Sequence, residues 1–429
     1  MDKALTYSHS VFGQSFLDGY FKLWALVLPI TSVVLIPSIQ GTTPAYIMAF
    51  LSLPVFLIAA RLKDIRRYLT ILFFFALGFI TLSLASQFFL SLYGGMDLSN
   101  LPLVDPLYLT QQVILRPTLF TQTLYLMTGL LTLLFVLECY NPSWDRYIFA
   151  GILLLVVYGF YEVSYYWLTG HSGDFLSNRV FNQQHSGSLF QTIRFGDIRI
   201  QRMKSLTGEP SMFAFTVLPY WIFALHTRRY SIAGILTLAL VLSTSTTAIV
   251  GIVVYCGLLI ISGRVEIKYL LAAAGAGAVI VIIKFQTVWA IFNKLVIQKL
   301  SAESVSGMTR LANLKDCILF WLDAPLPTKF FGLGFGYVRS TDFFSTLLVN
   351  NGLIGLAIMA LAFGYPILAL GSSNKEFGLK CALIVIAVSL LSSIPEFAYL
   401  SIWLFLGISY NYLNHKHDAP AQHLYRRSS

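Results

Sequence analysis

Apolar runs separated by short polar segments make up most of this chain. A helix needs about 20 mostly apolar residues to cross a bilayer, and twelve segments approach or exceed that length. They cover residues 20–38, 44–61, 69–92, 119–140, 146–168, 210–227, 230–246, 247–262, 268–288, 343–370, 378–394 and 397–413. The pattern predicts an all-α polytopic membrane protein with about twelve transmembrane helices, folded as a single integral membrane domain over residues 1–429. The polar run at 243–247 fits either a tight turn or a helix interior.

The composition agrees with a membrane location. Hydrophobic residues make up 57% of the 429 residues and charged residues only 11%, whereas soluble proteins carry roughly 25% charged residues. The net charge of +10 comes mostly from short loops, so it does not indicate a nucleic-acid partner. The four cysteines are scattered, without the spacing of a metal site or a disulfide framework.

Basic loops predict the orientation, because short loops rich in Lys and Arg stay in the cytoplasm. Such loops lie at 61–67, 226–229, 263–268 and 374–380, and the tail at 415–427 is also basic. With twelve spans, all of these segments and both termini fall on the cytoplasmic side. The opposite side then carries the longer loops at 93–118, 169–209 and 289–342.

The two longest outer loops, 169–209 and 289–342, hold many cations. Long loops cross a membrane largely regardless of charge, so these cations either serve an external anion or pair with acids of the same loops. Residues 291–300 and 310–322 have apolar positions at helical spacing and predict short amphipathic helices, with residues 306–309 as a cap before the second. Gly332, Gly334 and Gly336 allow tight turns near a ligand.

Residues 194–219 join the first of these loops to an apolar helix. Pro210 suits the first position of that helix, and Arg199 and Arg202 would share one face if their segment were helical. An anion held there would meet these cations and the positive end of the helix. Asp342 is placed to cap a second outward-facing helix start, and we expect the two helix starts to converge on one anion-binding cavity.

Several motifs resemble one family. The segment RMKSLTGEPS at 202–211, the segment SGMTR at 306–310, the segment FFGLGFG at 330–336 and the segment NGLIGL at 351–356 are similar to those of Wzy-type polysaccharide polymerases, in the superfamily that includes O-antigen ligases. The resemblance places the protein in a bacterial inner membrane, with loops 169–209 and 289–342 in the periplasm. It implies undecaprenyl-pyrophosphate-linked oligosaccharides and membrane lipid as partners, with a chain-length regulator protein as a further partner and no nucleic acid.

The resemblance also implies a reaction, which is inverting glycosyl transfer that polymerises lipid-linked repeat units of O-antigen or a related surface polysaccharide. A hydroxyl of one unit attacks the anomeric carbon of the chain on another lipid, and undecaprenyl pyrophosphate leaves. The resemblance implies no metal and no other cofactor.

The chemistry of the side chains suggests which residues would take part in this reaction. Cations stabilise the charge of a leaving diphosphate, and arginine binds phosphate through paired N–H groups. The residues expected to bind the diphosphate are Arg199, Arg202, Arg310 and Arg339. Glu209 is the first candidate for a catalytic base and Asp342 the second, although Glu209 could equally be a carboxylate placed at a helix start. Glu162 and Lys315 are further candidates for contacts to the sugars.

Other functions stay open at this stage. The ligase branch typically has a histidine near the outer end of the span after the second loop, and residues 341–342 at that place contain none. A secondary transporter with twelve spans would have a similar length, but the sixth and seventh predicted spans are joined only by residues 226–230. A flippase for lipid-linked sugars would place charge within its spans, around a central cavity.

Overall fold

The computed structural model describes residues 2–37, 39–93, 95–105, 107, 115–180, 191–195, 198–264 and 305–425. Most of these residues are helical. The helices are α1 (Asp2–Val27), α2 (Pro44–Ala59), α3 (Leu62–Leu92), α4 (Pro117–Cys139), α5 (Asp145–Thr169), α6 (Pro210–His226), α7 (Tyr230–Ser243), α8 (Thr246–Ile261), α12 (Val305–Asp323), α13 (Leu326–Phe331), α14 (Phe343–Ala369), α15 (Asn374–Ser392) and α16 (Leu400–Tyr425), with short 3₁₀ turns at Pro142–Trp144 and Ser205–Thr207.

Within the described residues, four segments are long and apolar enough to cross a membrane: Asp64–Leu92, Pro117–Cys139, Pro142–Thr169 and Phe343–Ala369. Shorter apolar helices occupy Pro44–Ala59, Tyr230–Ser243 and Thr246–Ile261. These helices are compatible with a membrane protein. The predicted span at 268–288 and the amphipathic helix at 291–300 lie outside the described residues.

The first predicted span, 20–38, is wrong over its second half. α1 ends at Val27, and the described residues 28–37 and 39–43 form no helix. Pro29 disfavours helical geometry at the residue before it. The backbone N–H groups of Thr31 and Ser32 instead donate to the carbonyl of Leu206, at 2.9 and 3.1 Å. Hydropathy alone could not detect this contact with a residue far along the chain.

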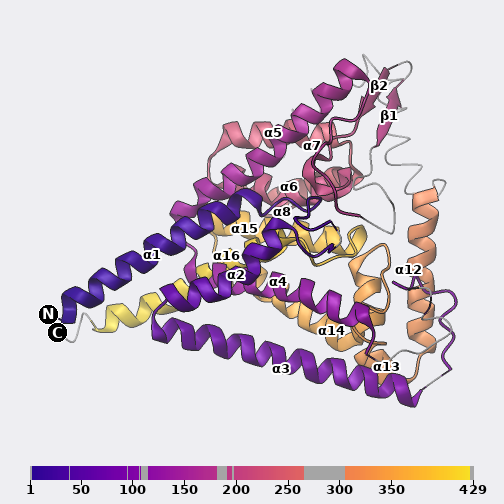
Figure 1. Ribbon diagram of the computed structural model, residues 1–429, viewed down its shortest axis with the longest axis horizontal. Coiled ribbons are helices and arrows are strands. Elements are labelled where there is room, and N and C mark those ends of the chain that lie inside the picture. Colours follow the sequence, from indigo (N-terminus) through magenta and orange to yellow (C-terminus); the bar gives the residue numbers. More distant parts are fainter. Residues whose placement is uncertain are drawn as a thin grey trace.

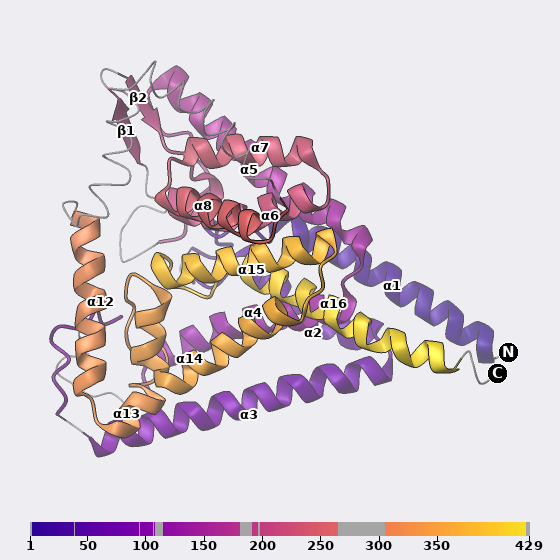
Figure 2. The same ribbon diagram turned by 180° about the vertical axis from the view of Figure 1, so that it is seen from behind.

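The helices form a bundle whose two ends differ. The N-terminal end of α1 and the C-terminal end of α16 lie at one end of the molecule in both views (Figures 1 and 2). The other end carries α13, a small hairpin of strands and α12, which runs across the bundle rather than along it (Figure 1). This arrangement separates a simple helical end from an end built of long connections.

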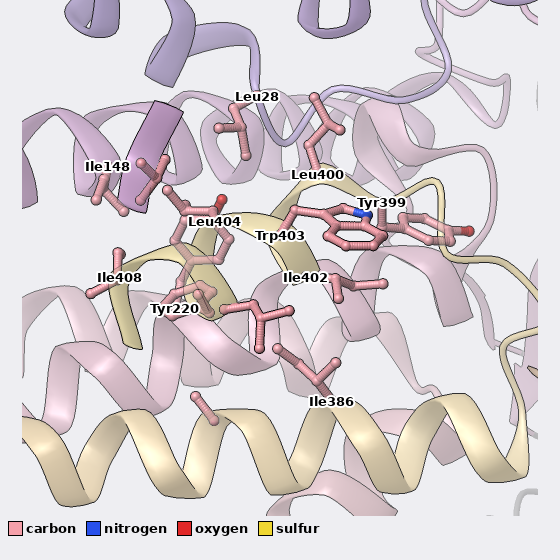
Figure 3. Packing of buried hydrophobic residues seen from close by; sticks show 14 of the residues in the cluster. Leu28, Ile148, Tyr220, Ile386, Tyr399, Leu400, Ile402, Trp403, Leu404 and Ile408 are labelled. Atoms are coloured by element: carbon pink, nitrogen blue, oxygen red, sulfur yellow. The ribbon is translucent and has the colours of Figure 1, made fainter. Parts of the chain in front are cut away.

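The core lies where α16 passes through the bundle. Figure 3 shows Tyr220 of α6 and Leu404 of α16 close together, with Ile148 of α5 to one side and Ile386 of α15 below them. These side chains belong to one buried apolar cluster, and Tyr220, Ile386 and Leu404 are each at most 1% exposed. α3 is different, because only 6% of its most apolar 18-residue stretch is buried. It lies along the edge of the bundle (Figure 2).

Loop 169–209 contains a departure from the all-α prediction in a mostly helical structure. Its described part contains an antiparallel hairpin of β1 (Thr192–Phe195) and β2 (Ile198–Gln201). The turn at 243–247 is resolved as the connection between α7 and α8, where Thr244 has φ 47° and Ser245 caps α8. The described part of α12 begins at Val305, so residues 306–309 are helical. They therefore do not form the expected cap before the helix.

The glycine-rich segment folds against a break in α14. Gly352 has φ 61° and ψ −160°, so α14 consists of two helical pieces. The N–H groups of Leu333 and Gly334 donate to the carbonyls of Val349 and Asn350, at 2.8 and 2.9 Å. A Cβ at Gly352 would lie 2.4 Å from the carbonyl oxygen of Phe330, so only glycine fits where the two backbones meet.

Candidate functional site

A cavity of about 370 Å³ brings together three of the residues singled out from the sequence: Arg202, Glu209 and Arg310. Its described lining comes from the exit of the hairpin, the starts of α6 and α8, the first turns of α12 and the end of α15. Ligand pockets typically measure about 300–1,000 Å³. We call this the first cavity.

Arg202 is held at the C-terminal end of α7. Its Nε donates to the hydroxyl of Thr244 at 3.0 Å, and its Nη2 donates to the carbonyl of Thr244 at 3.1 Å. Its Nη1 donates to the amide oxygen of Gln191. The negative end of a helix dipole favours a cation, so α7 positions this guanidinium without a neutralising carboxylate among these contacts.

The charge on Arg202 persists despite partial burial. Burial lowers the pKa of Arg202, and the carboxylate of Glu209 acts in the opposite direction. Arginine stays protonated in proteins because its guanidinium gives up a proton only far above physiological pH. Arg202 therefore presents a permanent positive charge to the cavity.

Arg310 reaches the cavity from α12. It is half-buried, and the described part of the chain offers it no ion pair or hydrogen bond. Gly307, one turn earlier on the same face of α12, also lines the cavity. Two arginines against one glutamate give the described lining a formal charge of +1.

Glu209 stands at the start of α6. Its backbone is extended at the N-cap position and its side chain does not cap the helix. One carboxylate oxygen accepts a hydrogen bond from the hydroxyl of Ser211. The starts of α6 and α8 both contribute to the lining, and each helix N-terminus adds a positive partial charge. The arrangement favours an anion.

A buried ion cluster fixes the segment that joins Arg202 to Glu209. Lys204 is fully buried between Glu162, at 2.9 Å from Nζ to Oε1, and Asp174. Burial alone would raise the pKa of Asp174, but the ammonium of Lys204 and hydrogen bonds from Ser177 hold it below its ordinary value. The hydroxyl of Ser205 donates to the carbonyl of Leu155 at 2.6 Å. The segment is thereby bonded to α5 and keeps both functional side chains in place.

Other lining residues, from α8 and the end of α15, are uncharged and carry hydroxyls; we call them the hydroxyl wall. Ser389, Ser392 and Ser393 line the cavity together with Thr247, and the hydroxyls of Thr247 and Ser393 lie 3.4 Å apart. Ser389 is 1% exposed, and its hydroxyl has no hydrogen-bond partner among the described residues. A buried hydroxyl without a partner is costly, so a polar ligand in the cavity would satisfy it.

Sequence reasoning missed this hydroxyl wall. A usable signal was present, because Ser389, Ser392 and Ser393 have spacings of three and four residues, which place them on one helix face. They stand at the end of an otherwise apolar run. Gln191 carried no comparable signal, since its role depends on the hairpin bringing it to Arg202.

The expected single cavity between two helix starts is wrong. The start of α14 lines a second cavity of about 170 Å³, and the two cavities share no described lining residue. Arg339 lines the second cavity and forms an ion pair with Glu396. Asp342 accepts from the N–H of Ser345 at 2.7 Å and from its hydroxyl at 2.8 Å. Asp342 thus acts as the cap of α14 and lines neither cavity.

The remaining candidates lie away from the first cavity. Arg199 is exposed on β2, opposite Arg194 in the hairpin register. Because the segment is a strand and not a helix, residues three apart point to opposite faces, and Arg199 does not join Arg202. Lys315 is exposed on α12. Glu162 is fully buried beside Lys204, so it supports the site from behind and does not line it.

No protein-family model, no curated protein and no solved structure matches this chain.

Proposed function

We propose that the protein is a Wzy-type polysaccharide polymerase that joins undecaprenyl-pyrophosphate-linked repeat units at the periplasmic face of a bacterial inner membrane. The observation that carries this proposal is the first cavity, whose described lining includes Arg202, Arg310 and Glu209 together with the starts of α6 and α8. The proposal includes the twelve-span topology expected from hydropathy, with both termini in the cytoplasm.

The cationic wall suits the diphosphate of a lipid carrier. Arginine pairs two N–H groups with phosphate oxygens, and a hydrogen bond to a charged group contributes about 1.5–3 kcal/mol. α7 and Gln191 hold the Arg202 guanidinium in advance, so no reorganisation is needed when charge develops on the leaving group. Arg310 supplies a second charge from a different element.

The hydroxyl wall suits the sugar next to the diphosphate. Serine and threonine both donate and accept hydrogen bonds, as sugar hydroxyls do. The buried Ser389 would gain its missing partner from such a sugar. A cavity lined by both cations and hydroxyls matches a sugar diphosphate better than either a free sugar or a free phosphate.

The proposed reaction is a single displacement. The acceptor hydroxyl attacks the anomeric carbon, its oxygen forms the new glycosidic bond, and the bond from that carbon to the diphosphate breaks with inversion. The electron pair leaves with the diphosphate oxygen, next to the arginines. Glu209 takes the hydroxyl proton as general base, and its second carboxylate oxygen is available because only one accepts from Ser211.

A transporter is the second candidate function, and one specific observation supports it. The break in α14 at Gly352 is typical of discontinuous transporter helices. Against this, the charges of the first cavity lie at loop–helix junctions and not within the middle of helices. That position favours a reaction at the membrane surface over passage through the bundle.

The proposal is tested with purified protein in detergent and lipid-linked repeat units, with the products separated on a gel. A ladder of lengths is expected. Product formed only after a lipid A core acceptor is added would assign the ligase reaction instead. No product from either acceptor, together with uptake or flipping in proteoliposomes, would replace the enzyme by a transporter.

A further inference from the structure

The second cavity has a different chemistry from the first. Its described lining includes Tyr125 and Gln122 of α4, Asn351 of α14 and the Arg339–Glu396 ion pair. The ring centroids of Phe335 and Phe397, which also line it, are 5.4 Å apart. The cavity thus combines aromatic faces with neutral amides, a cation paired with Glu396 and the guanidinium of Arg179, which donates to the carbonyl of Thr31 at 3.0 Å.

Its position links it to the first cavity. Ser392 and Ser393 line the first cavity, and residues 395–398 line the second. The short connection between α15 and α16 therefore contributes residues to both cavities.

One buried polar atom in this cavity lacks a partner. The amide oxygen of Asn351 is buried and makes no hydrogen bond to any described residue. The neighbouring Asn350 differs, because its amide bonds both the N–H and the carbonyl of Val338, each at 2.8 Å. Asn350 therefore holds the glycine-rich segment, while Asn351 is left to bind something else.

We propose that the second cavity is a carbohydrate subsite that holds one sugar ring of the acceptor chain. Ligand sites for such molecules are mostly apolar or aromatic with a few placed polar groups, and the Asn351 oxygen would accept from a sugar hydroxyl. The volume of about 170 Å³ suits one ring. The Arg339–Glu396 pair neutralises its own charge, and Arg179, the other cation of the described lining, donates to the carbonyl of Thr31. This inference rests on the proposed function.

The test uses two probes to distinguish binding in the two cavities, with the protein in nanodiscs. One probe is undecaprenyl diphosphate without sugar, and the other is the free repeat-unit oligosaccharide released from the cell's own polysaccharide, without lipid or diphosphate. We expect Asn351→Leu and Gln122→Leu to weaken oligosaccharide binding at least fivefold and to leave binding of undecaprenyl diphosphate unchanged. Asn100→Leu changes an exposed amide that lines neither of the two cavities and serves as control.

The outcomes for the two proposals differ. Absence of oligosaccharide binding to the wild type, or equal binding by wild type and both variants, overturns the carbohydrate subsite. Gln122→Leu keeps the test decisive if Asn351→Leu does not fold, because Gln122 is half-buried on α4 and away from the break in α14. Failure of Arg202→Ala to weaken undecaprenyl diphosphate binding would instead overturn the proposed function, whatever the oligosaccharide does.

Discussion

Arg202 suits phosphate binding because its neighbours position it without cancelling its charge. The carbonyl and hydroxyl of Thr244 and the amide of Gln191 are all neutral acceptors. Arg339 shows the contrast, since it is paired with Glu396. The residue types in both cases were visible in the sequence, but which arginine had a carboxylate partner depended on contacts between distant segments.

Ser389→Ala tests the hydroxyl wall. Loss of a neutral hydrogen bond costs about 0.5–1.5 kcal/mol, so we expect kcat/KM for the lipid-linked donor to fall roughly threefold to tenfold. Folding should be unaffected or slightly improved, because the wild-type hydroxyl has no partner among the described residues. Steady-state kinetics with varied donor concentration provide the measurement.

Ser409→Ala is the matched control. Ser409 is also fully buried, but its hydroxyl donates to the carbonyl of Phe405 within α16 at 2.8 Å. Its replacement should leave kcat/KM unchanged. Equal kinetics for Ser389→Ala and wild type would remove Ser389 from the site.

Among the elements, loop 169–209 shows most clearly which features the sequence pattern could predict and which it could not. The helix start at Pro210 follows from proline chemistry and is confirmed. The hairpin was not predicted, and with it the pairing of Arg199 and Arg202 on one face fails. Four-residue strands contain too few positions for an alternating pattern to stand out against helical spacing.

The buried cluster at Lys204 predicts a pH-dependent stability. The pKa of Asp174 is lowered in the folded protein, so its stabilising effect is complete above the ordinary value of 3.8 and is lost as pH falls through the lowered folded value. Asp174→Asn should therefore lower the free energy of unfolding at pH 7 by about 1–3 kcal/mol. The gap to wild type should close on acidification toward pH 3, in thermal or denaturant melts.

Asp323→Asn provides the comparison, because Asp323 is exposed on α12 and forms no ion pair with a described residue. It should match wild type at every pH. A gap between wild type and Asp174→Asn that stays constant from pH 7 to pH 3 would contradict the assigned role of the Lys204 pair.

The break in α14 should tolerate no side chain. Gly352→Ala forces an L-residue to φ 61° and brings its Cβ within 2.4 Å of the Phe330 oxygen. Backbone strain alone costs about 1–3 kcal/mol, so we expect a clear loss of thermal stability in detergent. Gly364→Ala, in the same helix with nothing within 4 Å of the added Cβ, should be neutral. Equal melting temperatures for the two variants would mean that the break is not required.

Over the whole molecule, hydropathy located most helices correctly, because bilayer-length apolar runs are a strong signal. Helices described at 117–139, 145–169 and 343–369 match predicted spans closely, whereas α3 begins at Leu62, within the predicted basic loop 61–67. The prediction failed for the segment after Val27 because its backbone forms hydrogen bonds with residues of the 169–209 loop instead of a helix. The division into two cavities could not be predicted, since it depends on how the segment at 332–342 folds back on α14.

The orientation can be measured by cysteine labelling in intact spheroplasts. Cysteines placed at exposed Arg199 and Lys315 should react with a membrane-impermeant maleimide, whereas one at exposed Ser372 should react only after permeabilisation. Cys139, Cys317 and Cys381 are buried, so only Cys256 needs replacement in the background. Labelling of position 372 from outside would reverse the topology and place the first cavity in the cytoplasm.

The central claim is that Arg202 and Arg310 stabilise a departing lipid diphosphate. The most direct measurement is the rate of ladder formation from lipid-linked repeat units by Arg202→Ala and Arg310→Ala, with exposed Arg199→Ala as the matched control. Loss of one preorganised donor typically slows such a step about 10²–10³-fold, so both cavity variants should lose the ladder while remaining folded, and Arg199→Ala should keep it. Normal ladders from both folded cavity variants would contradict the account.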